Sequence, residues 1–136
     1  LAMPGGGCRQ PATVDSVNAR IHFLKMEGKE VYKAAVNAMT AAAREVLERS
    51  GLGIEDIKCI IPHQANQRII SAIGDRLGAR EGQVFVNLHK YGNTSAASVA
   101  VALDEVVRSG KIQRGDKILI IAFGAGLTWG ATVLEW

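Results

Sequence analysis

The sequence has few cysteines, few aromatic residues and no long apolar run. Its two cysteines, Cys8 and Cys59, form no CxxC pair, which argues against a disulfide framework or a metal site and favours reduced thiols in the cytoplasm. Apolar runs such as residues 118–123 are far too short to span a bilayer, and no signal peptide is visible. The net charge is +3 without a dense basic stripe, which argues against nucleic acid as a partner.

The composition is that of one globular domain. Of the 136 residues, 48% are hydrophobic and 21% are charged, so the chain can form a core. It begins with Leu1 and continues into Pro4 and three glycines, which predicts a loop. We expect a piece of a longer protein, with tag residues as the alternative. Residues 1–17 are then a linker, and residues 18–136 form the domain.

Apolar periodicity predicts alternating strands and helices. Strands are expected at 20–26, 58–61, 84–88, 117–123 and 128–136, and helices at 29–49, 66–77 and 95–109. Such alternation predicts an α/β fold with a mostly parallel, mixed sheet and helices on both faces. The short connection before the last strand predicts that this strand is antiparallel.

Two polar residues stand at predicted strand-to-helix junctions, His63 after the apolar run that ends at Pro62 and Asn93 before the third helix. Ligands collect at the carboxyl ends of strands in such sheets. A neutral imidazole and an amide can both donate hydrogen bonds, so together they could stabilise an oxyanion or enolate. The alternatives are a loop histidine with a structural role and a turn or N-cap asparagine.

The remaining candidates have stronger structural interpretations. Asn66 could cap a helix, or it could orient His63. Cys59 lies in an apolar strand, and Cys8 has no base beside it, so neither is expected to be an activated nucleophile. His22 and His89 are expected to be structural or at the surface. The glycine-rich residues 123–129 precede no helix, so they are not a phosphate-binding loop. They could instead bring backbone amides close to a ligand.

Three motifs together resemble β-ketoacyl-acyl-carrier-protein synthase III, of the thiolase-like superfamily. They are Pro62-His63-Gln64-Ala65-Asn66, Tyr91-Gly92-Asn93-Thr94-Ser95-Ala96-Ala97-Ser98 and Phe123-Gly124-Ala125-Gly126-Leu127-Thr128-Trp129-Gly130. The resemblance covers about residues 17–136 and matches only the C-terminal half of that family. It implies the C-terminal half of the duplicated thiolase fold.

The resemblance implies a decarboxylative condensation of acyl-CoA with malonyl-acyl-carrier protein, the step that starts fatty-acid synthesis. His63 and Asn93 match the family's enolate-stabilising pair, whereas the nucleophilic cysteine belongs to the N-terminal half. We therefore expect this chain to be inactive alone and to work in a cytoplasmic, homodimeric enzyme. The expected partners are acyl-CoA, acyl carrier protein and the N-terminal half, with no cofactor, metal, nucleic acid or membrane.

Further residues match family positions. Met26, Gly28 and Tyr32 match the pantetheine and CoA tunnel, Phe123 matches the pocket phenylalanine, and Asn66 matches the residue that supports the histidine. Ala125 stands where the family often has glycine and would offer its backbone amide to an oxyanion, provided that the position does not need a positive φ. Arg68 matches a basic residue that meets the carrier protein, or it is an ordinary solvated helix arginine.

Two other functions stay open. The chain could come from a related ketosynthase III-like acyltransferase of secondary metabolism, which joins acyl groups to a different acceptor. It could also be a non-catalytic half domain that binds CoA or a carrier protein.

Overall fold

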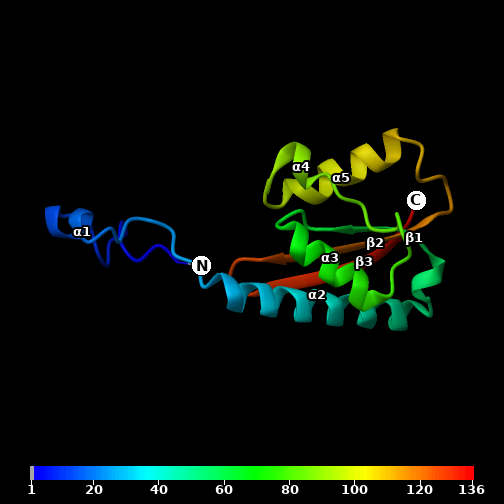
Figure 1. Ribbon diagram of the computed structural model, residues 1–136, viewed down its shortest axis with the longest axis horizontal. Coiled ribbons are helices and arrows are strands. Elements are labelled where there is room, and N and C mark those ends of the chain that lie inside the picture. Colours follow the sequence, from blue (N-terminus) through cyan, green and yellow to red (C-terminus); the bar gives the residue numbers. More distant parts are fainter. Residues whose placement is uncertain (1) are drawn as a thin grey trace. The chain divides into compact units, whose positions relative to one another are not determined.

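The chain forms the mixture of helices and strands that the periodicity predicts, but with fewer strands. The computed structural model describes residues 2–136, and Figure 1 follows its elements by colour. In chain order they are α1 (Val14–Asn18), α2 (Gly28–Ser50), the 3-10 helix η1 (Ile54–Asp56), β1 (Ile57–Pro62), α3 (Gln67–Leu77), α4 (Leu88–Tyr91), α5 (Ala97–Arg108), β2 (Lys117–Gly124) and β3 (Thr128–Glu135). Within residues 2–136 no helix combines the length and apolarity needed to cross a membrane.

The chain divides into two compact units, one up to Tyr32 and one of Lys33–Trp136. The second unit contains the sheet, whose strand order is β1-β2-β3. β1 pairs with β2 in parallel, and β2 pairs with β3 in antiparallel fashion. The antiparallel last strand and the mixed sheet are therefore confirmed. The domain boundary at residue 17 stays a prediction.

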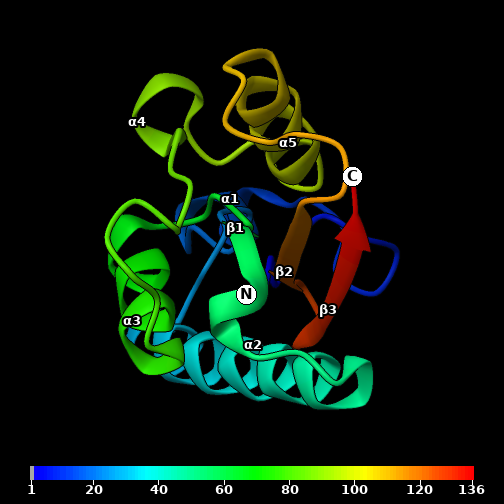
Figure 2. The same ribbon diagram turned by 90° about the vertical axis from the view of Figure 1, so that its right-hand side faces the viewer.

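Helices cover both faces of the sheet in the second unit. Figure 2 shows α5 on one side of the strands and α2 with α3 on the other. On the α5 side, Cys59 and Ile61 of β1 and Ile118 of β2 form a buried cluster with Ala102 and Val106 of α5. Side chains alternate along a strand, so the buried neighbours Ile60, Leu119 and Ile121 serve the opposite face. Strands buried on both faces explain the nearly continuous apolar runs.

The predicted helices at 29–49, 66–77 and 95–109 are confirmed within one or two residues. α3 shows why its sequence is helical. Ile69, Ile70, Ile73 and Leu77 form one buried stripe at helical spacing. The Asn66 side chain caps the N-terminus, and Gly78 ends the helix in a left-handed conformation at φ 70°.

The strand predicted at 20–26 is wrong. The chain forms α1, turns at Arg20, which has φ 55°, and within residues 2–136 this segment makes one bridge, between Ala2 and Lys25. An alternating pattern forms a strand only where a neighbour supplies a ladder of hydrogen bonds, and here one pair supplies it. The helix α1 also corrects the expectation that residues 1–17 are all loop; Thr13 caps it by accepting from the Ser16 amide.

The strand predicted at 84–88 is also wrong beyond its first residues. Val84 makes a single parallel bridge with Ile60, and the chain then bends into α4 at Leu88. The backbone amides of Asn87 and Leu88 donate to the side chain of Gln64 instead of to a strand. A buried side chain thus replaces the ladder, which periodicity alone could not indicate.

Candidate functional site

His63 follows directly after β1, at the carboxyl edge of the sheet. Its backbone amide donates to the carbonyl of Ile121 at 2.8 Å, which extends the pairing of β1 with β2 by one residue. This bond fixes His63 beside the end of β2, where Phe123 and Gly124 lead into the hairpin. The half-buried ring contacts the hydroxyl of Ser98, with Nδ1 and Oγ 2.6 Å apart.

Burial lowers the pKa of His63 below its ordinary value of 6.5. The imidazole is therefore neutral at physiological pH and carries one N–H. The sequence predicted a neutral ring from the neighbouring helix terminus; the structure gives the same direction, with desolvation as the cause. The Nε2 atom has no protein partner among residues 2–136, so it is open to a ligand.

Asn93 lies in the exposed loop before α5 and does not cap that helix. The N-cap is Ala96, which makes no side-chain cap bond. The Asn93 side-chain oxygen accepts the backbone amide of Ser95 at 3.1 Å, an Asx turn. An amide donor requires an oxygen acceptor, so this bond fixes the orientation of the side chain. The donor end of Asn93, its NH2 group, has no protein partner in the described part of the chain.

Ser98 connects the two predicted donors. It lies in the first turn of α5, five residues after Asn93, and its hydroxyl contacts the ring of His63. The loop that carries Asn93 therefore ends against His63. Sequence reasoning did not single out Ser98, although a signal existed. A serine that shares a helix face with Ala102 and Val106 is a polar side chain on an apolar stripe, and it is only 2% exposed.

Gln64, the residue after His63, belongs to the same site, and sequence reasoning did not single it out either. Its side chain is 1% exposed and makes four hydrogen bonds. The amide group donates to the carbonyls of Pro62 and Phe85, and the oxygen accepts the amides of Asn87 and Leu88. The strand end at His63 is thereby tied to the segment that leads into the Asn93 loop.

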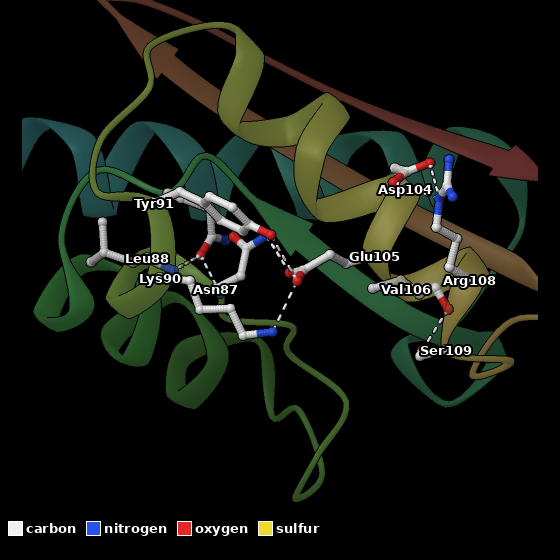
Figure 3. Close-up of polar contacts among 10 residues, drawn as sticks. Asn87, Leu88, Lys90, Tyr91, Asp104, Glu105, Val106, Arg108 and Ser109 are labelled. Atoms are coloured by element: carbon white, nitrogen blue, oxygen red, sulfur yellow. Dashed lines mark hydrogen bonds and ion pairs between the residues drawn. The ribbon is translucent and has the colours of Figure 1, made fainter.

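A carboxylate on α5 anchors the same segment, as Figure 3 shows. Glu105 accepts from Asn87 at 2.8 Å, from Lys90 at 2.9 Å and from Tyr91 at 3.1 Å. Hydrogen bonds from Lys90 and then Asn87 lower the pKa of Glu105. Lys90, Tyr91 and Glu105 border an open hollow between α4 and α5 that includes neither His63 nor Asn93. The charged side chains around this hollow pair with each other, so they hold the loop in place.

The other predicted residues of the second unit lie near the strand ends or the start of α3. Asn66 caps α3 by accepting the amide of Arg68 at 2.8 Å, and Arg68 is exposed in the first turn. The half-buried Phe123 pairs with Trp129 at the hairpin. Ala125 is not among the residues with positive φ, whereas Gly126 and Leu127 are. Alanine is therefore compatible with this turn, and its amide is retained.

Met26, Gly28 and Tyr32 belong to the first unit, where Met26 is 60% exposed and Gly28 begins α2. His22 contacts the Ser16 hydroxyl there at 2.8 Å, a structural role, and His89 is exposed on α4. Cys59 is fully buried, and burial raises the pKa of its thiol, which confirms its place in the core. Within residues 2–136, no group of three His, Cys, Asp or Glu side chains could hold a metal ion.

The fold and these strand-end residues define a class. A mixed sheet covered on both faces, with His63 at its carboxyl edge, is an α/β domain, and solved structures show that it is of the thiolase-like type. The 3-oxoacyl-[acyl-carrier-protein] synthase III of Aquifex aeolicus is 50% identical, with a TM-score of 0.82, over 85% of this chain and 37% of that chain. The priming β-ketosynthase of the R1128 polyketide pathway is 44% identical, with a TM-score of 0.78, over 91% of this chain and 39% of its own.

Sequence comparison gives the family. The model for the 3-oxoacyl-[acyl-carrier-protein] synthase III C terminal matches residues 47–136. The β-ketoacyl-[acyl-carrier-protein] synthase III of Caldanaerobacter subterraneus is 57% identical over the whole chain, which spans 41% of that protein. The chain belongs to the 3-oxoacyl-[acyl-carrier-protein] synthase III family and corresponds to its C-terminal part.

Proposed function

We propose that this chain is the C-terminal catalytic domain of a 3-oxoacyl-[acyl-carrier-protein] synthase III, which condenses acyl-CoA with malonyl-acyl-carrier protein. The observation that carries the proposal is the pair of open donors, Nε2 of His63 and the NH2 group of Asn93, on segments joined by Ser98. A family relative of 57% identity along the whole chain supports the choice of reaction.

In the proposed reaction, a cysteine thiolate from the N-terminal half attacks the carbonyl of acyl-CoA and releases CoA as a thiolate, which takes up a proton from solvent. Malonyl-acyl-carrier protein then loses carbon dioxide, and the electrons of the broken bond form a thioester enolate. His63 and Asn93 donate hydrogen bonds to the enolate oxygen as its negative charge develops. The enolate carbon attacks the acyl-cysteine, and the thiolate leaves.

The nucleophile comes from outside residues 1–136. Cys59 is enclosed in the core, where substrate cannot reach its sulfur. Cys8 is exposed in the first unit, outside the motifs of the family. We therefore expect the chain alone to lack condensation activity. Activity belongs to the whole enzyme, which we propose to be a cytoplasmic homodimer without a cofactor.

The remaining residues receive supporting roles in this proposal. Met26, Gly28 and Tyr32 line the pantetheine and CoA tunnel, and Phe123 and Asn66 border the pocket. The amide of Ala125 faces the oxyanion of the acyl-transfer step. Arg68, exposed at the start of α3, meets the acidic carrier protein.

A kinetic separation of the two half-reactions tests the proposal. In the whole enzyme, His63→Ala and Asn93→Ala should each lower malonyl decarboxylation by about 10²- to 10³-fold, the effect typical of removing one oxyanion donor. Acyl transfer from CoA to the cysteine should persist. His89→Ala, on exposed α4, serves as the matched control and should leave both rates unchanged. Decarboxylation at the wild-type rate in both active-site variants would contradict the proposal.

A second candidate is a priming ketosynthase of a polyketide pathway, which the R1128 enzyme at 44% identity favours. The chemistry of His63 and Asn93 would be the same, and the carrier protein would differ. Condensation rates with the fatty-acid and the polyketide carrier proteins of the source organism distinguish the two. A non-catalytic role would be indicated if the whole protein bound CoA or carrier protein but did not catalyse the condensation.

A further inference from the structure

One buried hydroxyl lies between the ring of His63 and the backbone that follows it. The Oγ atom of Ser98 is 2.6 Å from Nδ1 of His63 and 3.2 Å from the backbone nitrogen of Gln64. Ser98 is 2% exposed, so solvent offers its hydroxyl almost no alternative partner. These two contacts are the hydrogen bonds of this hydroxyl among the described residues.

The protons of this small network can be assigned. The backbone N–H of Gln64 can only donate, so the Oγ atom of Ser98 accepts that bond. If Nδ1 of His63 also donated, the oxygen would accept twice and its own proton would be buried without a partner, which is unfavourable. If the hydroxyl donates to Nδ1, every group is satisfied. The single proton of the neutral ring then resides on Nε2.

We propose that Ser98 is a positioning residue that holds His63 in the tautomer with its proton on Nε2. This assignment makes the open ring nitrogen a donor, whereas the other tautomer would present a lone pair and repel a negative oxygen. The desolvation that keeps the ring neutral supports the proposal, because only a neutral ring has a tautomer to select. The use of the donor rests on the proposed function; the tautomer itself does not.

The same serine links the two donors. Its backbone amide donates to the carbonyl of Ser95 at 3.1 Å, and the amide of Ser95 donates to the side-chain oxygen of Asn93. Ser95 has φ 53°, a left-handed conformation that is unfavourable for a residue other than glycine. Ser98 therefore fixes the ring of His63 from the helix turn whose preceding loop orients Asn93.

Nitrogen NMR of the whole enzyme tests the tautomer directly. With 15N-labelled histidine, two-bond proton–nitrogen correlations distinguish a protonated ring nitrogen from an unprotonated one. At a pH where His63 is neutral, the proposal predicts an unprotonated Nδ1 and a protonated Nε2, identified by the peak that disappears in His63→Ala. A protonated Nδ1 in the wild type would overturn the proposal, whatever the activity.

Substitution tests the consequence. Ser98→Ala should lower the kcat for malonyl decarboxylation by about 10- to 100-fold, less than removal of the donor itself, and Nε2 should no longer carry the proton exclusively. Ser98→Thr keeps the hydroxyl and should restore both properties. Ser71→Ala, an exposed serine on α3, is the matched control. If Ser98→Ala kept the wild-type tautomer and rate, the positioning role would be refuted. If His63→Ala decarboxylated normally while the wild-type tautomer was as inferred, only the proposed function would fail.

Discussion

Gln64 allows the most quantitative test of how the site is held together. Gln64→Met keeps the length and volume of the side chain but removes all four hydrogen bonds. The carbonyl of buried Pro62 and the amide of Asn87, a residue 2% exposed, then lose their partner away from water. Phe85 and Leu88 are half-buried, and their backbone groups can reach solvent.

The magnitude follows from counting the buried groups. Each buried polar group left without a partner costs about 1–3 kcal/mol, so two cost about 2–6 kcal/mol, and we expect a loss of about 4 kcal/mol. Domains have about 5–15 kcal/mol of stability, so the variant should be much less stable but still folded. With a urea slope of about 2 kcal/mol/M, the unfolding midpoint should fall by about 2 M.

The matched control is Gln67→Met, three residues later at an exposed position of α3, where the side chain bonds to Ser71 and to no other residue of 2–136. Its free energy of unfolding should change by no more than about 0.5 kcal/mol. Urea unfolding of the two variants and the wild-type enzyme, followed by circular dichroism, gives the comparison. Equal midpoints for Gln64→Met and Gln67→Met would refute the view that Gln64 fastens the strand end at His63 to the segment before Asn93.

Three further predictions concern single groups. Burial lowers the pKa of His63 from 6.5, so between its folded and unfolded pKa values the unfolded state binds more protons. The free energy of unfolding should therefore fall as the pH drops through 6.5. An NMR titration midpoint of His63 at or above 6.5 would contradict this. The Thr40 hydroxyl on α2 is buried without a hydrogen-bond partner among residues 2–136. Thr40→Val should therefore raise the free energy of unfolding by about 1 kcal/mol in a urea titration, with Thr40→Ser as the control that keeps the hydroxyl and should show no gain. Arg68→Glu should raise the KM for malonyl-acyl-carrier protein about tenfold while leaving acyl transfer from CoA unchanged, because a rim charge acts on encounter with the acidic partner; an unchanged KM in steady-state kinetics would assign Arg68 the role of an ordinary surface residue.

The sequence predicted those elements whose own residues show the burial pattern. Continuous apolar runs indicate the buried strands β1 and β2, and an apolar stripe indicates the helix α3. Pro62 marks where β1 ends. The residues at 20–26 and 84–88 have similar patterns but make one bridge each. Strand pairing depends on a neighbour that the pattern of one segment does not reveal.

The site, like the fold, was predictable only where the signal lies in neighbouring residues. His63 and Asn93 were found because each stands next to a predicted element boundary. Ser98, Gln64 and Glu105 were not found, because all of their partners except Pro62 lie 14 to 35 residues away along the chain. A polar residue on an apolar stripe indicates that a partner exists, and only the folded structure identifies it.

In the proposed function, His63 and Asn93 both donate to the same thioester oxygen. Infrared difference spectroscopy of the whole enzyme, with a 13C-labelled malonyl-thioester analogue that cannot lose carbon dioxide, measures this polarisation directly. We expect a carbonyl stretch at lower frequency when the analogue is bound than in water, with a partial return in His63→Ala and in Asn93→Ala. A bound carbonyl whose frequency is the same in the wild type and both variants would show that the two side chains do not donate to this oxygen.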